Sequence, residues 1–144
     1  MFFRKNKIFS KPVETKRSEE VTFQPQDQLK WVVCSNQVEG VGQGVSVEVF
    51  IQEAKVLKFD LFEAGDGHFH LFTGDPRMKS GRIAIPEKTL KEQTKRLTFE
   101  LEFNLRNFRK LHHKEHIRSF NVDVPAVRAA LPELAMAVLE RGHH

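Results

Sequence analysis

Cysteine, tyrosine and long apolar runs are scarce or missing in this 144-residue sequence. Its single cysteine, Cys34, cannot form an internal disulfide, which excludes a small secreted domain held together by disulfides. No stretch contains the roughly 20 apolar residues that a membrane-spanning helix needs. The first residues also lack the apolar segment of a signal peptide. We therefore expect a cytoplasmic protein with no membrane span.

Motifs that would fix a chemistry are missing as well. No serine lies in a G-x-S-x-G sequence. The glycine-rich segment 40–44 precedes residues that alternate like a strand, whereas a phosphate-binding loop must precede a helix. These absences favour a non-enzymatic interaction or ligand-binding domain that acts through a protein partner. The sequence does not define that partner or the oligomeric state.

The net charge of +4 is concentrated near the start of the chain. Residues 1–20 contain six basic and three acidic side chains, whereas the rest of the chain contains 17 and 16. A basic, polar segment without a hydrophobic period is typical of a flexible tail. We therefore predict a flexible basic tail over residues 1–20 and a single α+β domain over residues 21–142. His143 and His144 resemble the remnant of an expression tag and are set aside.

Alternating apolar and polar residues predict that most of the domain is β-structure. The predicted strands cover residues 29–33, 45–51, a hairpin over 55–72, 82–85 and 120–122. The most regular alternation covers residues 97–105. It predicts a further strand whose apolar side chains, Phe99, Leu101 and Phe103, lie in the core.

Residues 87–95 are polar and fit either a short helix or a loop, and the clearer helical signals lie in the last third of the chain. The spacing of apolar residues over 105–111 predicts a short helix. Asp123 suits an N-cap and Pro125 suits a first helical turn, whereas Pro132 predicts a break between two terminal helices. Strands followed by helices predict an α+β fold with a mostly antiparallel sheet of six or seven strands and C-terminal helices. Closure of the sheet into a barrel is the alternative.

Two pairs of histidines are candidate metal ligands. His68 and His70 are separated by one residue on a predicted strand, which places both imidazoles on one face about 7 Å apart. His112 and His116, if helical, stand at positions i and i+4, a spacing at which two imidazoles share a zinc ion. These four residues predict a site for zinc or a similar metal. A metal-dependent enzyme is therefore one alternative function.

A locally basic segment over residues 106–118 supports a different alternative. Its cationic side chains surround Phe108, and cations beside an aromatic ring can follow phosphates and stack on a base. The candidate anion-binding residues are Arg106, Arg109, Lys110, Lys114 and Arg118. They predict an anion or nucleic-acid partner.

Overall fold

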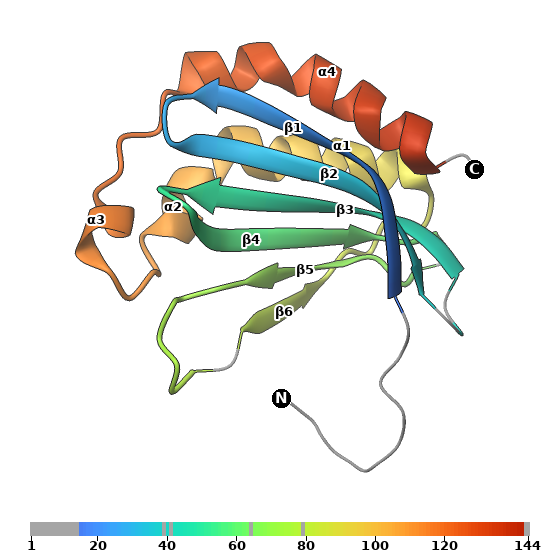
Figure 1. The fold of residues 1–144 in the computed structure, drawn as a ribbon, viewed down its shortest axis with the longest axis horizontal. Coiled ribbons are helices and arrows are strands. Elements are labelled where there is room, and N and C mark those ends of the chain that lie inside the picture. Colours follow the sequence, from blue (N-terminus) through green and yellow to red (C-terminus); the bar gives the residue numbers. More distant parts are fainter. Residues whose placement is uncertain (1–14, 39, 41, 64, 79, 143–144) are drawn as a thin grey trace.

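A computed structural model describes residues 15–38, 40, 42–63, 65–78 and 80–142 of the chain. Within them, six strands are followed by four helices (Figure 1). The strands are β1 (Thr15–Gln26), β2 (Leu29–Val38), β3 (Gly42–Ile51), β4 (Ala54–Leu61), β5 (His68–Leu71) and β6 (Gly81–Ala84). The helices are α1 (Leu90–Phe103), α2 (Leu105–Arg109), α3 (Glu115–Arg118) and α4 (Val124–Gly142).

The strands form one antiparallel sheet in which each strand pairs with its neighbours in the sequence, in the order β1-β2-β3-β4-β5-β6. Turns too short for a helical crossover join consecutive strands, so neighbouring strands must run antiparallel. The expected α+β class is confirmed, and the sheet is open rather than closed into a barrel. The domain boundary predicted after residue 20 falls inside β1, which begins at Thr15. Residues 1–14 of the predicted tail lie outside the described part of the chain.

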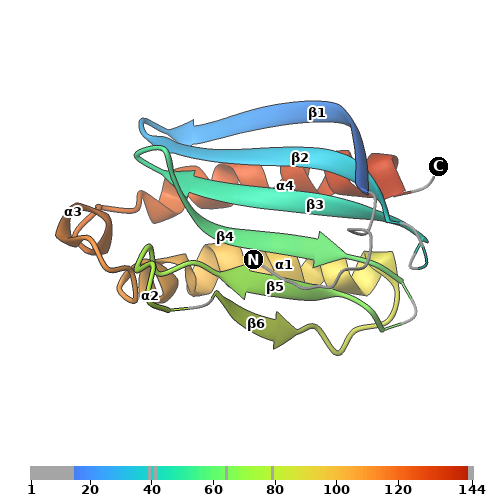
Figure 2. The same ribbon diagram turned by 60° about the horizontal axis from the view of Figure 1, so that its bottom comes forward.

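One face of the sheet forms the hydrophobic core. Alternate residues of the three central strands point to this face and are completely buried: Leu29, Trp31, Val33, Val45, Val47, Val49, Ile51, Leu57, Phe59 and Leu61. Helix α4 lies across β1, β2 and β3, and α1 lies beside α4 and against β4 (Figures 1 and 2). Both helices cover the same face. The opposite face therefore carries no helix in the described structure.

The strand predicted over residues 97–105 is wrong, because most of this segment belongs to α1. Leu97 and Leu101 are four residues apart, so a strand and a helix both place them on one side. The helix buries both of them, which confirms the core position predicted for Leu101. It turns Phe99 and Phe103 outward instead, and these rings are 48% and 52% exposed. The prediction that Phe99 and Phe103 belong to the core is therefore wrong as well.

A cap at the start of α1 favours the helix over the strand. The side-chain oxygen of Thr89 accepts a hydrogen bond of 3.2 Å from the backbone N–H of Glu92. The hydroxyl of Thr89 in turn donates to the Glu92 carboxylate. This spacing of Thr and Glu is the signature of a capping box.

The break predicted at Pro132 is wrong too, because α4 continues through this residue. Asp123 does cap the helix, since its carboxylate accepts a 3.1 Å hydrogen bond from the backbone of Ala126. Leu131 and Leu134, on either side of the proline, are buried against the core. Their burial compensates for the backbone hydrogen bond that a proline removes. None of the helices in the described residues is long and apolar enough to cross a membrane.

Residues 120–122 do not form the predicted last strand and instead make an extended connection into α4. The Gln26 side chain of β1 donates to the backbone carbonyl of Asn121 and accepts from the backbone N–H of Asp123. Val122 is buried. Side-chain hydrogen bonds and burial thus hold this connection where strand pairing was expected.

Candidate metal centre

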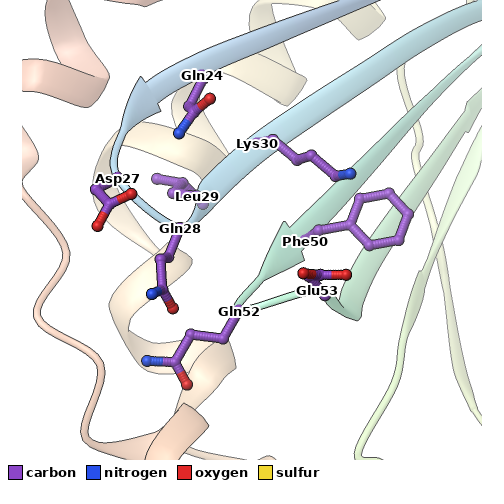
Figure 3. Close-up of a pocket in the computed structure, with 8 residues that line it drawn as sticks. All are labelled: Gln24, Asp27, Gln28, Leu29, Lys30, Phe50, Gln52 and Glu53. Carbon is purple, nitrogen blue, oxygen red and sulfur yellow. The ribbon is translucent and has the colours of Figure 1, made fainter.

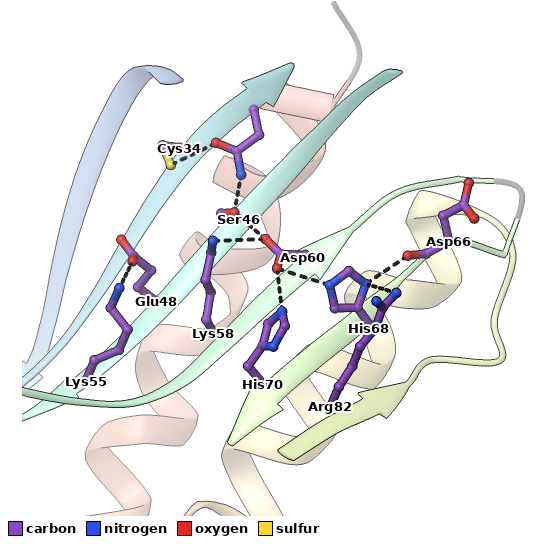
Figure 4. A network of polar contacts seen from close by, with 11 residues as sticks. Cys34, Ser46, Glu48, Lys55, Lys58, Asp60, Asp66, His68, His70 and Arg82 are labelled. Carbon is purple, nitrogen blue, oxygen red and sulfur yellow. Dashed lines mark hydrogen bonds and ion pairs between the residues drawn. The ribbon is translucent and has the colours of Figure 1, made fainter. Parts of the chain in front are cut away.

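The face of the sheet opposite the helices carries a row of polar side chains across four strands. Cys34 of β2 pairs with Ser46 of β3, Ser46 pairs with Asp60 of β4, and Asp60 pairs with His68 of β5. Cross-strand partners point to the same face and lie about 5 Å apart, so this register brings the four groups together. Figure 4 shows their side chains along the row. Ser46 and Asp60 are buried there.

A second row runs beside the first. Glu48 of β3 pairs with Lys58 of β4, Lys58 pairs with His70 of β5, and His70 pairs with Arg82 of β6. His68 and His70 point to the same face, as their spacing predicts. Their rings meet edge to face with centroids 4.8 Å apart. The two rows therefore bring both imidazoles beside the carboxylate of the first row.

Both histidines converge on a single oxygen atom. Asp60 Oδ2 lies 3.3 Å from His68 Nε2 and 3.2 Å from His70 Nε2 (Figure 4). The Asp60 side chain is 9% exposed, and the two imidazoles are 14% and 25% exposed. Among the described residues, these three are the group whose ligand atoms all lie within 4.8 Å of one another. We call Asp60, His68 and His70 the Asp60 cluster.

The other carboxylate oxygen, Asp60 Oδ1, contacts polar groups on the side away from the two histidines. Ser46 Oγ donates a 2.7 Å hydrogen bond to Asp60 Oδ1, and Asn36 Nδ2 donates to Ser46 Oγ. The Asn36 side chain also contacts the Cys34 thiol, with 3.8 Å between Sγ and Oδ1. Lys58 Nζ lies 3.6 Å from Asp60 Oδ1. These contacts fix the carboxylate so that Oδ2 faces the two histidines.

The far nitrogen of His68 has two polar neighbours. Its Nδ1 lies 3.0 Å from the backbone carbonyl oxygen of Asp66. The same Nδ1 lies 3.3 Å from Arg82 Nη2. Contacts to a backbone carbonyl are the usual means by which a protein orients a metal-binding histidine. The ring is therefore held so that Nε2 points at Asp60.

The protonation states suit metal ligands, which must be free of the competing proton. Burial opposes the charge on Asp60, but His70, Lys58, Ser46 and His68 together outweigh it and hold the pKa of this carboxyl below its ordinary 3.8. Burial, with a contribution from the nearby Arg82, lowers the pKa of His68 below 6.5. At neutral pH the Asp60 cluster therefore presents a carboxylate and a neutral His68 imidazole.

The spacing of the Asp60 cluster fits a bound transition metal. Zinc binds histidine nitrogen and carboxylate oxygen at about 2.0–2.2 Å, so ligand atoms at the corners of a tetrahedron lie about 3.3 Å apart. The two nitrogen–oxygen distances of 3.3 and 3.2 Å match that separation. Charge-assisted hydrogen bonds between nitrogen and a carboxylate are shorter, at about 2.7–2.9 Å. The two contacts are longer than strong ionic hydrogen bonds, and their lengths suit both ordinary hydrogen bonds in the metal-free protein and neighbouring ligands of one ion.

The other predicted histidine pair is not brought together in this way. His112 precedes α3, which begins at Glu115, so His112 and His116 do not share a helix face. His112 is buried against Gly74, and its Nδ1 accepts a hydrogen bond of 3.1 Å from the backbone of Lys114. Burial, aided by surrounding cations, lowers its pKa below 6.5. His112 therefore serves the packing of the loops, and His116 is exposed on α3.

The basic segment over residues 106–118 uses two of its cations internally. Arg109 Nη1 donates to the backbone carbonyl of Arg118. Arg118 Nη1 donates to the carbonyls of His112 and His113, at 2.9 and 2.6 Å. The exposed cations of the predicted anion-binding set are Arg106, Lys110 and Lys114. An anion partner for this segment stays a prediction.

A separate hollow of about 420 Å³ lies at the other end of β4, between the β1–β2 and β3–β4 turns (Figure 3). Its polar lining comes from the side chains of Gln24, Asp27, Gln28, Lys30, Gln52 and Glu53. Lys30 Nζ lies 5.2 Å from the centroid of the Phe50 ring. None of the lining residues belongs to the group of potential metal ligands found in the described structure. The Asp60 cluster is therefore the better candidate for a functional site.

Asp60 is the member of the cluster that the sequence analysis missed. The hairpin over 55–72 is confirmed by the pairing of β4 with β5. Its register, which the pattern alone did not define, places Asp60 opposite His68. One signal was available: Asp60 alternates with the apolar Phe59 and Leu61, so it must point to the same face as the two histidines if the strands pair.

Three comparisons with known proteins found no match. No protein-family model matches the sequence, and no curated protein or solved structure is significantly similar to the chain. The functional conclusion therefore depends on the geometry of the site.

Proposed function

We propose that this protein is a ligand-binding domain whose ligand is a divalent transition-metal ion held by Asp60, His68 and His70. The observation that carries the proposal is the convergence of two Nε2 atoms on Asp60 Oδ2, at 3.3 and 3.2 Å. That spacing is the one expected for neighbouring ligands of a single ion.

The chemistry of the three side chains defines the class of ion. Two imidazoles and one carboxylate form a mixed nitrogen and oxygen set, which suits Zn²⁺, Fe²⁺, Co²⁺ or Ni²⁺ better than Ca²⁺ or Mg²⁺. Three protein ligands leave at least one coordination position open, as in sites where the metal also binds a small molecule. Zinc is the ion we expect to bind most readily among those abundant in cells.

The groups around the cluster support the same conclusion. Metal-binding carboxylates and histidines are usually oriented by outer hydrogen bonds. Asp60 has this support from Ser46, and His68 has it from the Asp66 carbonyl. Moreover, the cluster sits on paired strands rather than on a loop, which keeps ligand positions defined.

The test is metal binding by tag-free protein, because His143 and His144 would bind metal themselves. Zn²⁺ affinity is measured by competition with a chromophoric chelator, and Co²⁺ binding by its d–d absorption. We expect one ion per chain. Replacing one ligand, by Asp60→Asn or His70→Gln, should weaken binding by more than about 100-fold, since removing even an outer-shell group costs 10–100-fold.

His116→Gln is the matched control, because it makes the same substitution at an exposed histidine of α3. It should leave the affinity unchanged. Urea unfolding of each variant without metal shows whether the fold is retained. Metal at 100 times its Kd should also stabilise the wild-type fold by about 2.7 kcal/mol. Binding that survives His70→Gln in a folded variant, or that is lost in His116→Gln, would overturn the proposal.

A further inference from the structure

The far side of His68 offers two hydrogen-bond arrangements that exclude each other. The Asp66 carbonyl, 3.0 Å from Nδ1, can only accept a hydrogen bond, so it requires a proton on Nδ1. The guanidinium of Arg82, 3.3 Å from the same atom, can only donate, so it requires a lone pair there. A given state of the ring satisfies one neighbour and not the other.

The state of the Asp60 cluster decides which neighbour is satisfied. Without a metal, His68 Nε2 faces the Asp60 carboxylate at 3.3 Å and must carry the ring proton, which leaves a lone pair on Nδ1 for Arg82. A metal on Nε2 would take the lone pair of that nitrogen, so the ring proton would lie on Nδ1, where it can be donated to the Asp66 carbonyl. Arg82 then loses its acceptor on His68.

Arg82 borders a hollow that becomes positive when the metal is present. The hollow has a volume of about 340 Å³, and its charged lining consists of Lys58, Asp60, Asp66 and Arg82. Two cations and two carboxylates balance one another, so a divalent ion adds a net charge of about +2 at this place. Arg82 and two of the proposed ligands, Asp60 and His68, line this hollow.

We propose that the hollow binds a small oxyanion, a carboxylate or a phosphate, between the metal held by the Asp60 cluster and the guanidinium of Arg82. The inference rests on the proposed metal-binding function. One anion oxygen completes the coordination of the metal, and a second accepts hydrogen bonds from Arg82, whose planar fork matches carboxylate and phosphate groups. Metal and oxyanion therefore bind cooperatively, because the metal both attracts the anion and frees Arg82 from His68.

The test uses protein loaded with one equivalent of Co²⁺ and titrated with acetate or with inorganic phosphate at constant ionic strength. Changes in the d–d absorption report an added ligand on the metal. We expect saturable binding of at least one of the two anions, and the preferred anion identifies the ligand class. Arg82→Gln should still bind one Co²⁺, because all three proposed ligands remain, and should weaken the anion by about tenfold, because it removes a charged hydrogen-bond donor.

Arg128→Gln is the matched control, since Arg128 is paired with Glu102 on the helical side of the molecule. It should change neither affinity. If the wild-type protein does not bind Co²⁺, the proposed metal site itself is overturned. Normal Co²⁺ binding with no spectral response to either anion, or with equal anion affinity in Arg82→Gln, would overturn the oxyanion site alone. Equal binding of the anion to the metal-free protein would overturn the cooperativity.

Discussion

The two faces of the sheet bury their side chains in different ways. The face under α1 and α4 buries mainly apolar side chains of its central strands, with Trp31 and Phe59 completely buried. The opposite face carries Ser46, Glu48 and Asp60, which are also nearly inaccessible to solvent, although no helix of the described structure covers them. One face thus buries groups that gain from leaving water, and the other buries groups that lose hydration.

The apolar face contributes to the stability of the fold, whereas the polar face contributes little to it. Burial of Phe59 contributes to folding directly, because apolar area leaves water. A buried carboxylate such as Asp60 is a weak source of stability, since apolar residues of similar volume often do as well or better. The chain nevertheless provides Asp60 with several polar partners and two histidines. These polar partners support the proposed ligand site.

The largest change in the free energy of unfolding that we predict comes from the apolar face, where a buried phenylalanine is compared with a half-exposed one. Phe59→Ala should lower the free energy of unfolding by about 3–5 kcal/mol, because the ring is completely buried. Phe99→Ala should lower it by less than about 1 kcal/mol, since that ring is half exposed on α1. Urea unfolding of the two variants measures both. A similar loss for both variants would show that Phe99 lies in the core, as a strand over 97–105 would require.

The Phe99 comparison also shows where sequence patterns mislead. When apolar residues occupy every second position, those at positions i and i+4 lie on one side of both a strand and a helix. A strand and a helix therefore predict the same burial for Leu97 and Leu101. The two structures differ at Phe99 and Phe103, which a strand would bury and the helix exposes. Because both residues are apolar, the sequence does not indicate that they are exposed. The capping pair Thr89 and Glu92 was the distinguishing signal, and it lies outside the alternating segment.

The sheet itself was easier to predict, because apolar and polar residues alternate along 29–33, 45–51 and 55–72 and turns separate these segments. The candidate site was predictable in part: the spacing of His68 and His70 placed both on one face. The third ligand depended on the register of the β4–β5 hairpin, which the loop between the strands sets. The burial of His112 could not be predicted for a related reason, since it depends on a contact with Gly74, far away in the sequence.

A smaller effect is expected on the polar face, behind the metal site. Ser46→Ala removes the 2.7 Å hydrogen bond to Asp60 Oδ1 and leaves all three proposed metal ligands in place. Zn²⁺ affinity should fall by about tenfold, the usual effect of losing an outer-shell partner. Ser119→Ala, at the exposed C-terminal end of α3, provides the same substitution away from the strands that carry the cluster. Equal Zn²⁺ affinity in Ser46→Ala and the wild type would show that Asp60 is oriented without Ser46.

The smallest effect that we predict on the free energy of unfolding at neutral pH concerns His112. This effect grows on acidification. The polar face surrounds Asp60 with groups that stabilise its charge, and the resulting low pKa contributes stability that is lost only as pH falls below about 3.8. His112 has the opposite surroundings. Burial, and then the nearby Lys114, His116, His113 and Arg118, disfavour its protonated form and lower its pKa below 6.5.

Below about pH 6.5 the unfolded chain therefore binds more protons at residue 112 than the folded chain does, so stability falls on acidification from this pH. His68, whose pKa is also lowered, acts in the same direction. Urea unfolding of metal-free protein at pH 7.5, 6.5 and 5.5 measures the slope. His112→Asn keeps an acceptor for the backbone N–H of Lys114 but cannot be protonated in this range. We expect this variant to be less stable at pH 7.5 and less sensitive to acid. A variant with the slope of the wild type would show that His112 does not titrate against folding, and that the acid sensitivity comes from the polar face.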